Sequence, residues 1–273
     1  MKKFLSVLLA LGLAVSATAC AGGASSSSEA ASSEPEATPA AESEAATSEA
    51  AAATGEVMTY DEYMAAAVDE AVTIESCVQA KQSYYAEQGT ATVYLQDEDG
   101  AYFAYDMACT QEEYDQMTEG TRIRVSGYKA EWSGEIEIMD GQLDEILEGD
   151  TYVAEPVDVT ELLGTDELES HQNQKVKFTG LTVAPSTIEG DTTEYAFLYN
   201  YDGSGTQGDD VYFNVEYNGE TYQFLVESYL CDSSTDVYKA VEALEIGQTI
   251  DCEGFLYWYE GVNPHITSVT VAG

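Results

Sequence analysis

The sequence has very little positive charge. Its 273 residues include 9 Lys and Arg against 51 Asp and Glu, which gives a formal net charge of −42. Proteins that bind nucleic acid need Lys and Arg to replace the counterions condensed at phosphates, and anionic lipid headgroups attract the same residues. The composition therefore predicts no nucleic-acid partner, and it favours cations and basic partners instead.

Signatures of catalysis are also missing. The chain has only 2 His, and neither His171 nor His265 has a Cys, a Ser or a second His at a recognisable spacing. The motifs GxSxG, HExxH and SxxK and Gly-rich phosphate loops are absent, as is CxxC, which redox sites and zinc knuckles use. We therefore expect a protein that is not an enzyme and that uses no cofactor.

The N-terminus has the pattern of an export signal. Lys2 and Lys3 precede the apolar run from Phe4 to Val15, which is too short to span a membrane as a mature helix, and small residues precede Cys20. This stretch resembles a lipobox, although the usual Leu is absent. The resemblance implies that residues 1–19 are a lipoprotein signal peptide and that Cys20 is lipidated. The protein would then be anchored in the membrane at the extracytoplasmic surface of a bacterium. An ordinary secretory peptide is the alternative.

Residues 20–55 are rich in Ala, Ser and Glu and have no aromatic residue. Such a composition offers nothing to bury, so we expect a disordered tether.

Residues 56–149 predict a small β-barrel. Three strand-like segments lie between Ala71 and Cys109, a short helix follows Thr110, and two further strands end near Ile146. Thr110 and Glu113 have the spacing of a capping box. The order β-β-β-α-β-β is the signature of the OB-fold, a five-stranded Greek-key barrel.

The pattern occurs a second time in residues 173–273, after a linker at residues 150–172. A strong Asn-Gly hairpin turn lies at Asn218, and Trp132 and Trp258 occupy the same hairpin of the two copies. The predicted fold class is mainly β, with two tandem OB-fold-like five-stranded Greek-key barrels. Each barrel has a short helix between its third and fourth strands.

Aromatic residues gather at the hairpin that joins strands four and five, and OB barrels often bind ligands at this loop and on the face of strands two and three. Exposed rings there stack on sugars or hold a partner protein. The alternative is that these rings cover barrel ends or pack the two domains together. The candidate ligand-binding residues are Trp132, Trp258, Tyr128, Tyr257 and Tyr259.

Each predicted barrel contains two of the cysteines that follow Cys20. An exported protein with this arrangement suggests one disulfide in each domain, Cys77 with Cys109 and Cys231 with Cys252. Four buried thiols are the alternative.

One acidic loop places oxygen-bearing side chains near alternate positions, as at the start of a calcium loop. It lacks the glutamate at position twelve, so a flexible insertion is favoured and no metal is expected. The weak metal candidates are Asp202, Ser204, Thr206, Asp209 and Asp210.

Four basic residues lie on or near the first and fourth strands of the first barrel: Lys81, Arg122, Arg124 and Lys129. We favour pairing with nearby acids over a basic patch on the ligand face.

Four segments carry a resemblance to a known group: CVQAKQ, DEDGAYF, YDMAC and GYKAEWSGEIEI. They resemble the repeated OB domain of uncharacterised surface lipoproteins of Gram-positive bacteria, a resemblance that implies no activity. The leading hypothesis is a membrane-anchored extracytoplasmic binding or interaction lipoprotein with a glycan or protein ligand. A structural cell-envelope protein whose aromatics are internal is the alternative, and an enzyme of unknown type is third.

Overall fold

The computed structural model describes residues 55–272. The predicted signal peptide, Cys20 and nearly the whole predicted tether lie outside the described residues. Among the residues that are described, no helix is both long enough and apolar enough to cross a membrane.

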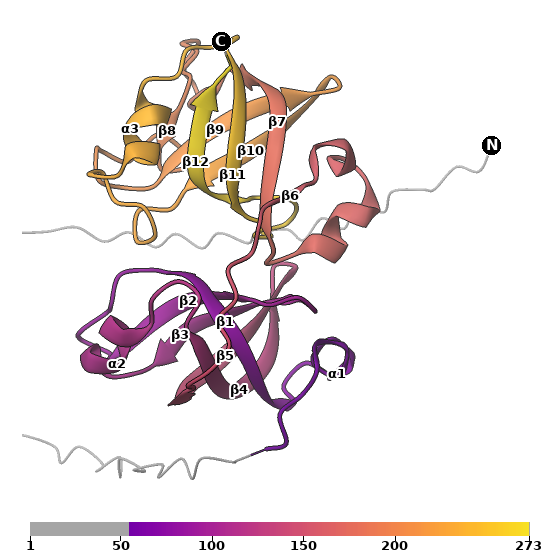
Figure 1. Cartoon of the computed structure of the whole chain (residues 1–273). Helices are drawn as coiled ribbons and strands as arrows, with labels where there is room; N and C mark the ends of the chain where they lie inside the picture. Colours follow the sequence, from indigo (N-terminus) through magenta and orange to yellow (C-terminus); the bar gives the residue numbers. More distant parts are fainter. Residues whose placement is uncertain (1–54, 273) are drawn as a thin grey trace, which may run out of the picture. The chain divides into compact units, whose positions relative to one another are not determined.

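The first barrel is a closed sheet of five strands (Figure 1). The strands are β1 (Ala71–Lys81), β2 (Thr90–Gln96), β3 (Ala101–Ala108), β4 (Arg122–Trp132) and β5 (Glu135–Ile146). Their order is β1-β2-β3-β5-β4, and β1 also pairs with β4, which closes the barrel. Inward-facing residues such as Ile74, Val93 and Ile138 are fully buried and form its core.

Two short helices belong to this barrel, and both begin with a capping box, the motif predicted at Thr110. The Thr59 side chain caps α1 (Tyr60–Ala65), and the Thr110 side chain caps α2 (Gln111–Gln116), each in a full capping box. The helix α2 lies between β3 and β4 along the chain. Tyr63 of α1 is buried in the core of the barrel, where its ring meets the edge of Tyr102 at 5.0 Å between ring centroids.

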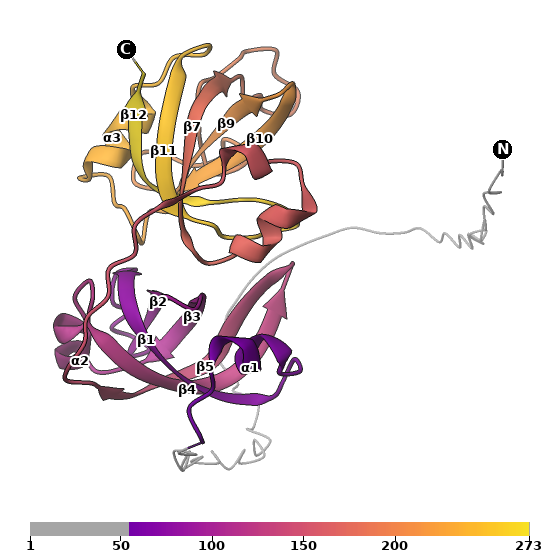
Figure 2. The ribbon, with the colours of Figure 1, turned by 45° about the vertical axis from the view of Figure 1, so that its right-hand side comes forward.

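The second barrel repeats this topology. Its strands are β7 (Lys175–Ala184), β9 (Val211–Tyr217), β10 (Glu220–Val226), β11 (Thr249–Phe255) and β12 (His265–Val271), with α3 (Asp236–Glu242) between β10 and β11. The strands β7, β11 and β12 lie side by side in both views (Figures 1 and 2), and pairing of β7 with β9 closes the ring. The short strands β6 (Val157–Asp158) and β8 (Leu198–Tyr199) extend the sheet. The predicted fold class is confirmed.

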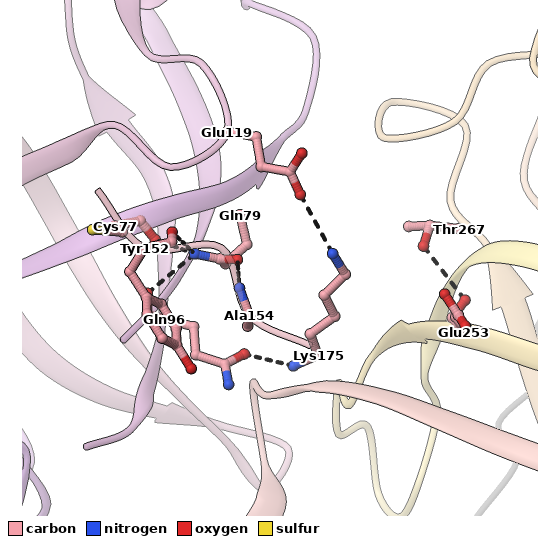
Figure 3. Close-up of polar contacts among 9 residues, drawn as sticks. All are labelled: Cys77, Gln79, Gln96, Glu119, Tyr152, Ala154, Lys175, Glu253 and Thr267. Atoms are coloured by element: carbon pink, nitrogen blue, oxygen red, sulfur yellow. Dashed lines mark hydrogen bonds and ion pairs between the residues drawn. The ribbon is translucent and has the colours of Figure 1, made fainter. Parts of the chain in front are cut away.

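The connection between the barrels is fixed by buried amide side chains (Figure 3). The Gln79 side-chain nitrogen lies 3.1 Å from the carbonyl oxygens of Gln96 and Tyr152, and its oxygen accepts a 2.8 Å hydrogen bond from the Ala154 amide. The Gln96 side-chain oxygen accepts a 2.7 Å bond from the Lys175 amide at the start of β7. Buried amides of this kind need all their partners, so they hold the connecting segment in one path. This segment also contains two 3₁₀ helices, Thr160–Leu162 and Asp166–His171.

Candidate ligand groove

The outer face of β2 is the starting point of the candidate site. Every residue of β2 is buried, although only alternate residues face the core of the first barrel. The outward-facing Tyr94 forms a separate apolar cluster with Phe103 of β3 and Phe255 of the second barrel. Part of the face that OB barrels commonly use for ligands is thus occupied by the second barrel.

A row of aromatic rings continues from this cluster. The ring of Tyr94 stacks on Phe255 at 4.5 Å between centroids and meets Phe103 at 5.0 Å, and Phe103 meets Tyr257 at 5.4 Å. Tyr257 in turn stacks on His265 at 4.2 Å. These separations are those of favourable offset-stacked and edge-to-face pairs, so the row forms a rigid wall.

His265 is part of this wall and not a free titrating group. Its Nδ1 lies 2.5 Å from the hydroxyl of Tyr94, with which it shares a hydrogen bond. Complete burial lowers the pKa of His265 to about 3, so the imidazole is neutral at physiological pH.

Beside this wall lies a groove of about 960 Å³ that both barrels line, which we call the tyrosine groove. Phe103, Tyr257 and His265 form part of its lining, and Trp132 and Tyr259 lie together at 5.1 Å between centroids. Six of the lining rings are exposed, between 43% and 69% of their full surface: Tyr85, Tyr105, Trp132, Tyr201, Tyr229 and Tyr259. Aromatic rings that are exposed in a concave site are available for stacking on a ligand.

The charges in the tyrosine groove are all negative. Asp106 and Glu227 line it, and no Lys or Arg does so among the described residues. Glu227 is only 8% exposed, and its two oxygens accept hydrogen bonds from the amides of Tyr229 and Leu230 at 3.2 and 2.8 Å. Burial, and secondly the charge of Asp210, raise the pKa of Glu227 to about 7.

The four basic residues of the first barrel are engaged elsewhere. Arg124 pairs with Glu75 at 2.6 Å and with Glu145 at 2.8 Å, and Arg122 lies 3.7 Å from Asp97. The Lys129 ammonium donates to the carbonyl oxygen of Met64 at 2.7 Å, and that of Lys81 lies 3.7 Å from the centre of the Tyr114 ring. The expected pairing with acids is thus found for the two arginines and not for the two lysines, and none of the four side chains lines the groove among the described residues.

The structure brings together three of the five aromatic residues that the sequence singled out. Trp132, Tyr257 and Tyr259 line the tyrosine groove. Tyr128 is exposed but lies in a different hollow, beside β1 and residues 55–58. Trp258 is a packing residue: it contacts the core of the second barrel and covers Gly134, where an added Cβ would lie 2.7 Å from its ring. The packing interpretation thus holds for Trp258, and ligand binding by the other rings stays a prediction.

Several residues of the groove and of the wall beside it were missed. Tyr94 of the wall and Phe103 and Tyr105 of the groove are outward-facing residues of β2 and β3. The alternation of Phe103 and Tyr105 with core residues was a signal that β3 is apolar on both faces. Tyr201 and Tyr229 come from loops, where no periodicity exists to mark them.

The expected disulfides are not formed in the structure, where all four cysteines are free. Cys77 pairs across the sheet with Gln96 and Arg122, whereas Cys109 lies near Lys81, four residues further along β1. Four residues of strand span about 13 Å, and a disulfide requires Cα atoms within about 7 Å. Cys231 and Cys252 both contact the core of the second barrel, also as thiols.

The acidic loop is held by its own hydrogen bonds. Asp202 accepts from the Ser204 amide at 3.0 Å, Asp209 from the Thr206 amide at 2.8 Å, and Asp210 from the Ser228 hydroxyl at 2.7 Å. Within residues 55–272, no group of three or more acidic, His or Cys side chains is arranged to hold a metal ion. The loop oxygens therefore serve the loop itself.

No family model matches the chain, and no curated protein matches it. The chain is similar to a solved structure of a murine DNA-binding protein bound to double-stranded DNA, with 11% identity and a TM-score of 0.36 over 74% of this chain and 96% of that one. It is also similar to a replication protein A heterotrimer bound to single-stranded DNA, with 12% identity and a TM-score of 0.27 over 74% of this chain and 49% of that one. A deletion mutant of the single-stranded DNA-binding protein from Thermus aquaticus has 13% identity and a TM-score of 0.25, over 74% of this chain and 94% of that one. At these identities the likeness shows the fold alone.

These findings correct two expectations. The structures that the chain is similar to are of DNA-binding proteins, so the expectation of a membrane-anchored extracytoplasmic module for glycan or protein ligands is wrong. The expectation that nucleic acid is not a partner is wrong on the same finding, whereas lipidation of Cys20 lies outside the described residues and stays a prediction. The first expectation relied on the hairpin aromatics and on residues 1–20, and the second relied on net charge.

Proposed function

We propose that the chain is a non-catalytic binding protein that holds planar heteroaromatic rings, the chemistry of nucleobases, in the tyrosine groove. The single observation that carries the proposal is the set of exposed aromatic rings that both barrels contribute to this one concave site. Stacking of a base on an aromatic side chain contributes about 1–3 kcal/mol and tolerates any base, because each has a flat π face.

The geometry supports stacking more than polar recognition. The wall of Tyr94, Phe103, Tyr257 and His265 is preorganised by its ring contacts, so a ligand ring does not have to order it. Tyr105 and Tyr259 reach the groove from the first and the second barrel and are about half exposed, so they present ring surface on two sides.

Isothermal titration calorimetry of the full chain with adenosine tests the proposal. Tyr105→Ala and Tyr259→Ala are each expected to lower the affinity about tenfold, the loss of one stacking contact. Tyr128→Ala is the matched control, because Tyr128 is equally exposed but lies outside the groove. No binding to the wild type, or equal losses in all three variants, would overturn the proposal.

An oligonucleotide presents the same rings joined by phosphates, and it sharpens the test. With a net charge of −42 on the protein, added salt screens the repulsion between protein and phosphates, so the affinity for an oligodeoxyadenylate is expected to rise with salt. Proteins that bind phosphates through Lys and Arg show the opposite slope. A falling affinity would place the oligonucleotide on another, basic surface and would count against the groove.

A further inference from the structure

We infer that the tyrosine groove selects planar organic cations over uncharged rings of the same shape, and that Glu227 is the residue that makes this selection. The inference rests on the proposed function, since it assigns the charge of the ligand that the groove takes.

The first argument is the combination of rings and charge in the lining. The exposed rings of Tyr105, Trp132 and Tyr259 present electron-rich faces, which attract cations. Among residues 55–272, the formal charges that line the groove are the carboxyl groups of Asp106 and Glu227. An uncharged ring gains stacking alone in such a site, whereas a cationic ring gains stacking, cation–π attraction and Coulomb attraction to a carboxylate.

The second argument is the position of Glu227. Its side chain lies at the end of β10, is 8% exposed, and accepts one hydrogen bond at each oxygen, from the Tyr229 and Leu230 amides. Each carboxylate oxygen has two lone pairs, so each keeps a free acceptor site. No ion pair involves this residue in the described part of the chain. A cation in the groove would be the first positive charge beside it.

The surroundings of Glu227 make the affinity for a cation depend on pH. The titratable groups that face it are Asp210 and Tyr212 on the β9 side, Cys231 before α3, Tyr94 of β2 and His265 of β12. Burial keeps the tyrosines, the thiol and His265 uncharged near neutral pH, so Asp210 supplies the only other charge. Because the pKa of Glu227 is about 7, this carboxyl loses its proton between pH 6 and 8, and its attraction for a cation grows over that interval.

The test compares two probes of the same shape, quinoline and the permanently charged N-methylquinolinium, by calorimetry on the full chain at pH 6, 7 and 8. N-methylquinolinium is expected to bind the wild type about tenfold more tightly than quinoline at pH 8, which is about the effect of one unit charge in a partly screened site. This preference is expected to shrink several-fold at pH 6.

The variant Glu227→Gln is expected to reduce the preference several-fold and to abolish its pH dependence, while the cation–π attraction of the rings remains. It is expected to keep quinoline binding, because Gln retains an oxygen acceptor for one backbone amide. Glu161→Gln is the charge control, since Glu161 is exposed and outside the groove lining. Thermal melting checks that the variants fold. If Glu227→Gln does not fold, the inference is decided by how the wild-type affinities for the two probes change with pH.

The outcomes separate the inference from the function it rests on. Equal affinity for both probes at every pH would overturn the cation selection and leave the groove as a stacking site. A preference that is undiminished in Glu227→Gln, or that Glu161→Gln reduces equally, would overturn the role of Glu227. If neither quinoline nor adenosine binds, the proposed function itself fails.

Discussion

Trp132 and Trp258 occupy corresponding hairpins of the two barrels but have different environments. Trp132 at the end of β4 is 53% exposed and lines the tyrosine groove beside Tyr259. Trp258 follows β11, packs on the core of the second barrel and covers Gly134 of the first barrel's hairpin. Repetition of a residue in two copies of a fold therefore does not imply repetition of its role. One copy exposes the ring in the tyrosine groove, and the other packs it against the first copy's hairpin.

The largest expected difference between the two tryptophans is in stability. Trp258→Ala removes a large packed ring and is expected to lower the free energy of unfolding by about 3 kcal/mol. Denaturation in urea, followed by circular dichroism, measures this loss. Trp258→Phe, which retains part of the packing, is expected to recover about half of it. A loss no larger than that of Trp132→Ala would remove the distinction between the two rings.

The contact between Trp258 and Gly134 gives the next effect. Gly134 has φ of +95°, and an added Cβ would lie 2.7 Å from the Trp258 ring, so Gly134→Ala is expected to cost about 2 kcal/mol from backbone strain and displacement of the ring. Gly219→Ala is the matched control. Gly219 also lies at a hairpin, with φ of +86°, but has no atom within 4 Å of such a Cβ. Its expected cost is the backbone part alone, about 1 kcal/mol. Equal costs in urea denaturation would show that the ring moves freely.

Glu135 connects the two hairpins and predicts a dependence of stability on pH. Its Oε2 accepts a 2.9 Å hydrogen bond from the Trp258 amide, and burial raises the pKa of this carboxyl from its ordinary 4.5 to about 9. The folded state therefore keeps a proton that the unfolded chain has lost. Stability is greatest below about pH 4.5 and falls by about 1.4 kcal/mol per pH unit until the folded carboxyl ionises near pH 9.

Comparison of the wild type with Glu135→Gln between pH 7 and 8 isolates the contribution of Glu135. Burial raises the pKa of Glu137 and Glu227 to about 7, so these two carboxyls also lose part of their protons over this interval, in both proteins. Unfolding in urea at pH 7 and 8 is expected to show a loss of stability that is about 1 kcal/mol larger in the wild type than in Glu135→Gln. An equal loss in the two proteins would mean that Glu135 is already ionised at pH 7.

The smallest expected effect on stability is that of Trp132→Ala. An exposed ring contributes little to folding, so the expected loss is below about 0.5 kcal/mol. The same variant is expected to bind adenosine about tenfold more weakly, because the ring lines the groove. Calorimetry and urea denaturation on one preparation give both quantities. A stability loss without an affinity loss would make Trp132 a packing residue like Trp258.

The two barrels could be predicted from the sequence because the patterns that mark their turns and helix starts involve only residues close together in the chain. The capping box at Thr110 and the Asn218-Gly219 turn each depend on neighbouring residues, and each is found in the structure. The strand order then follows from the few ways in which five such strands close.

The site was predicted only in part because it is made by contact between segments far apart in the chain. Trp132, Tyr257 and Tyr259 were found because they lie at the expected hairpins. Tyr94 and Phe103 belong to strands whose sequence pattern is that of ordinary barrel strands. They become part of the wall beside the groove only because Phe255 and His265 of the second barrel pack against Tyr94. Burial of Glu227 likewise depends on residues that no local pattern connects to it.

The double burial of β2 sets a limit on how this chain can be divided. A fragment that ends in the linker near Ala154 would expose Tyr94 and Phe103 on a barrel face that lacks Phe255. It would carry an uncovered apolar strip of the kind that promotes self-association. The two barrels are repeats in topology but not interchangeable modules. Expression of either half alone is expected to require replacement of these rings by polar residues.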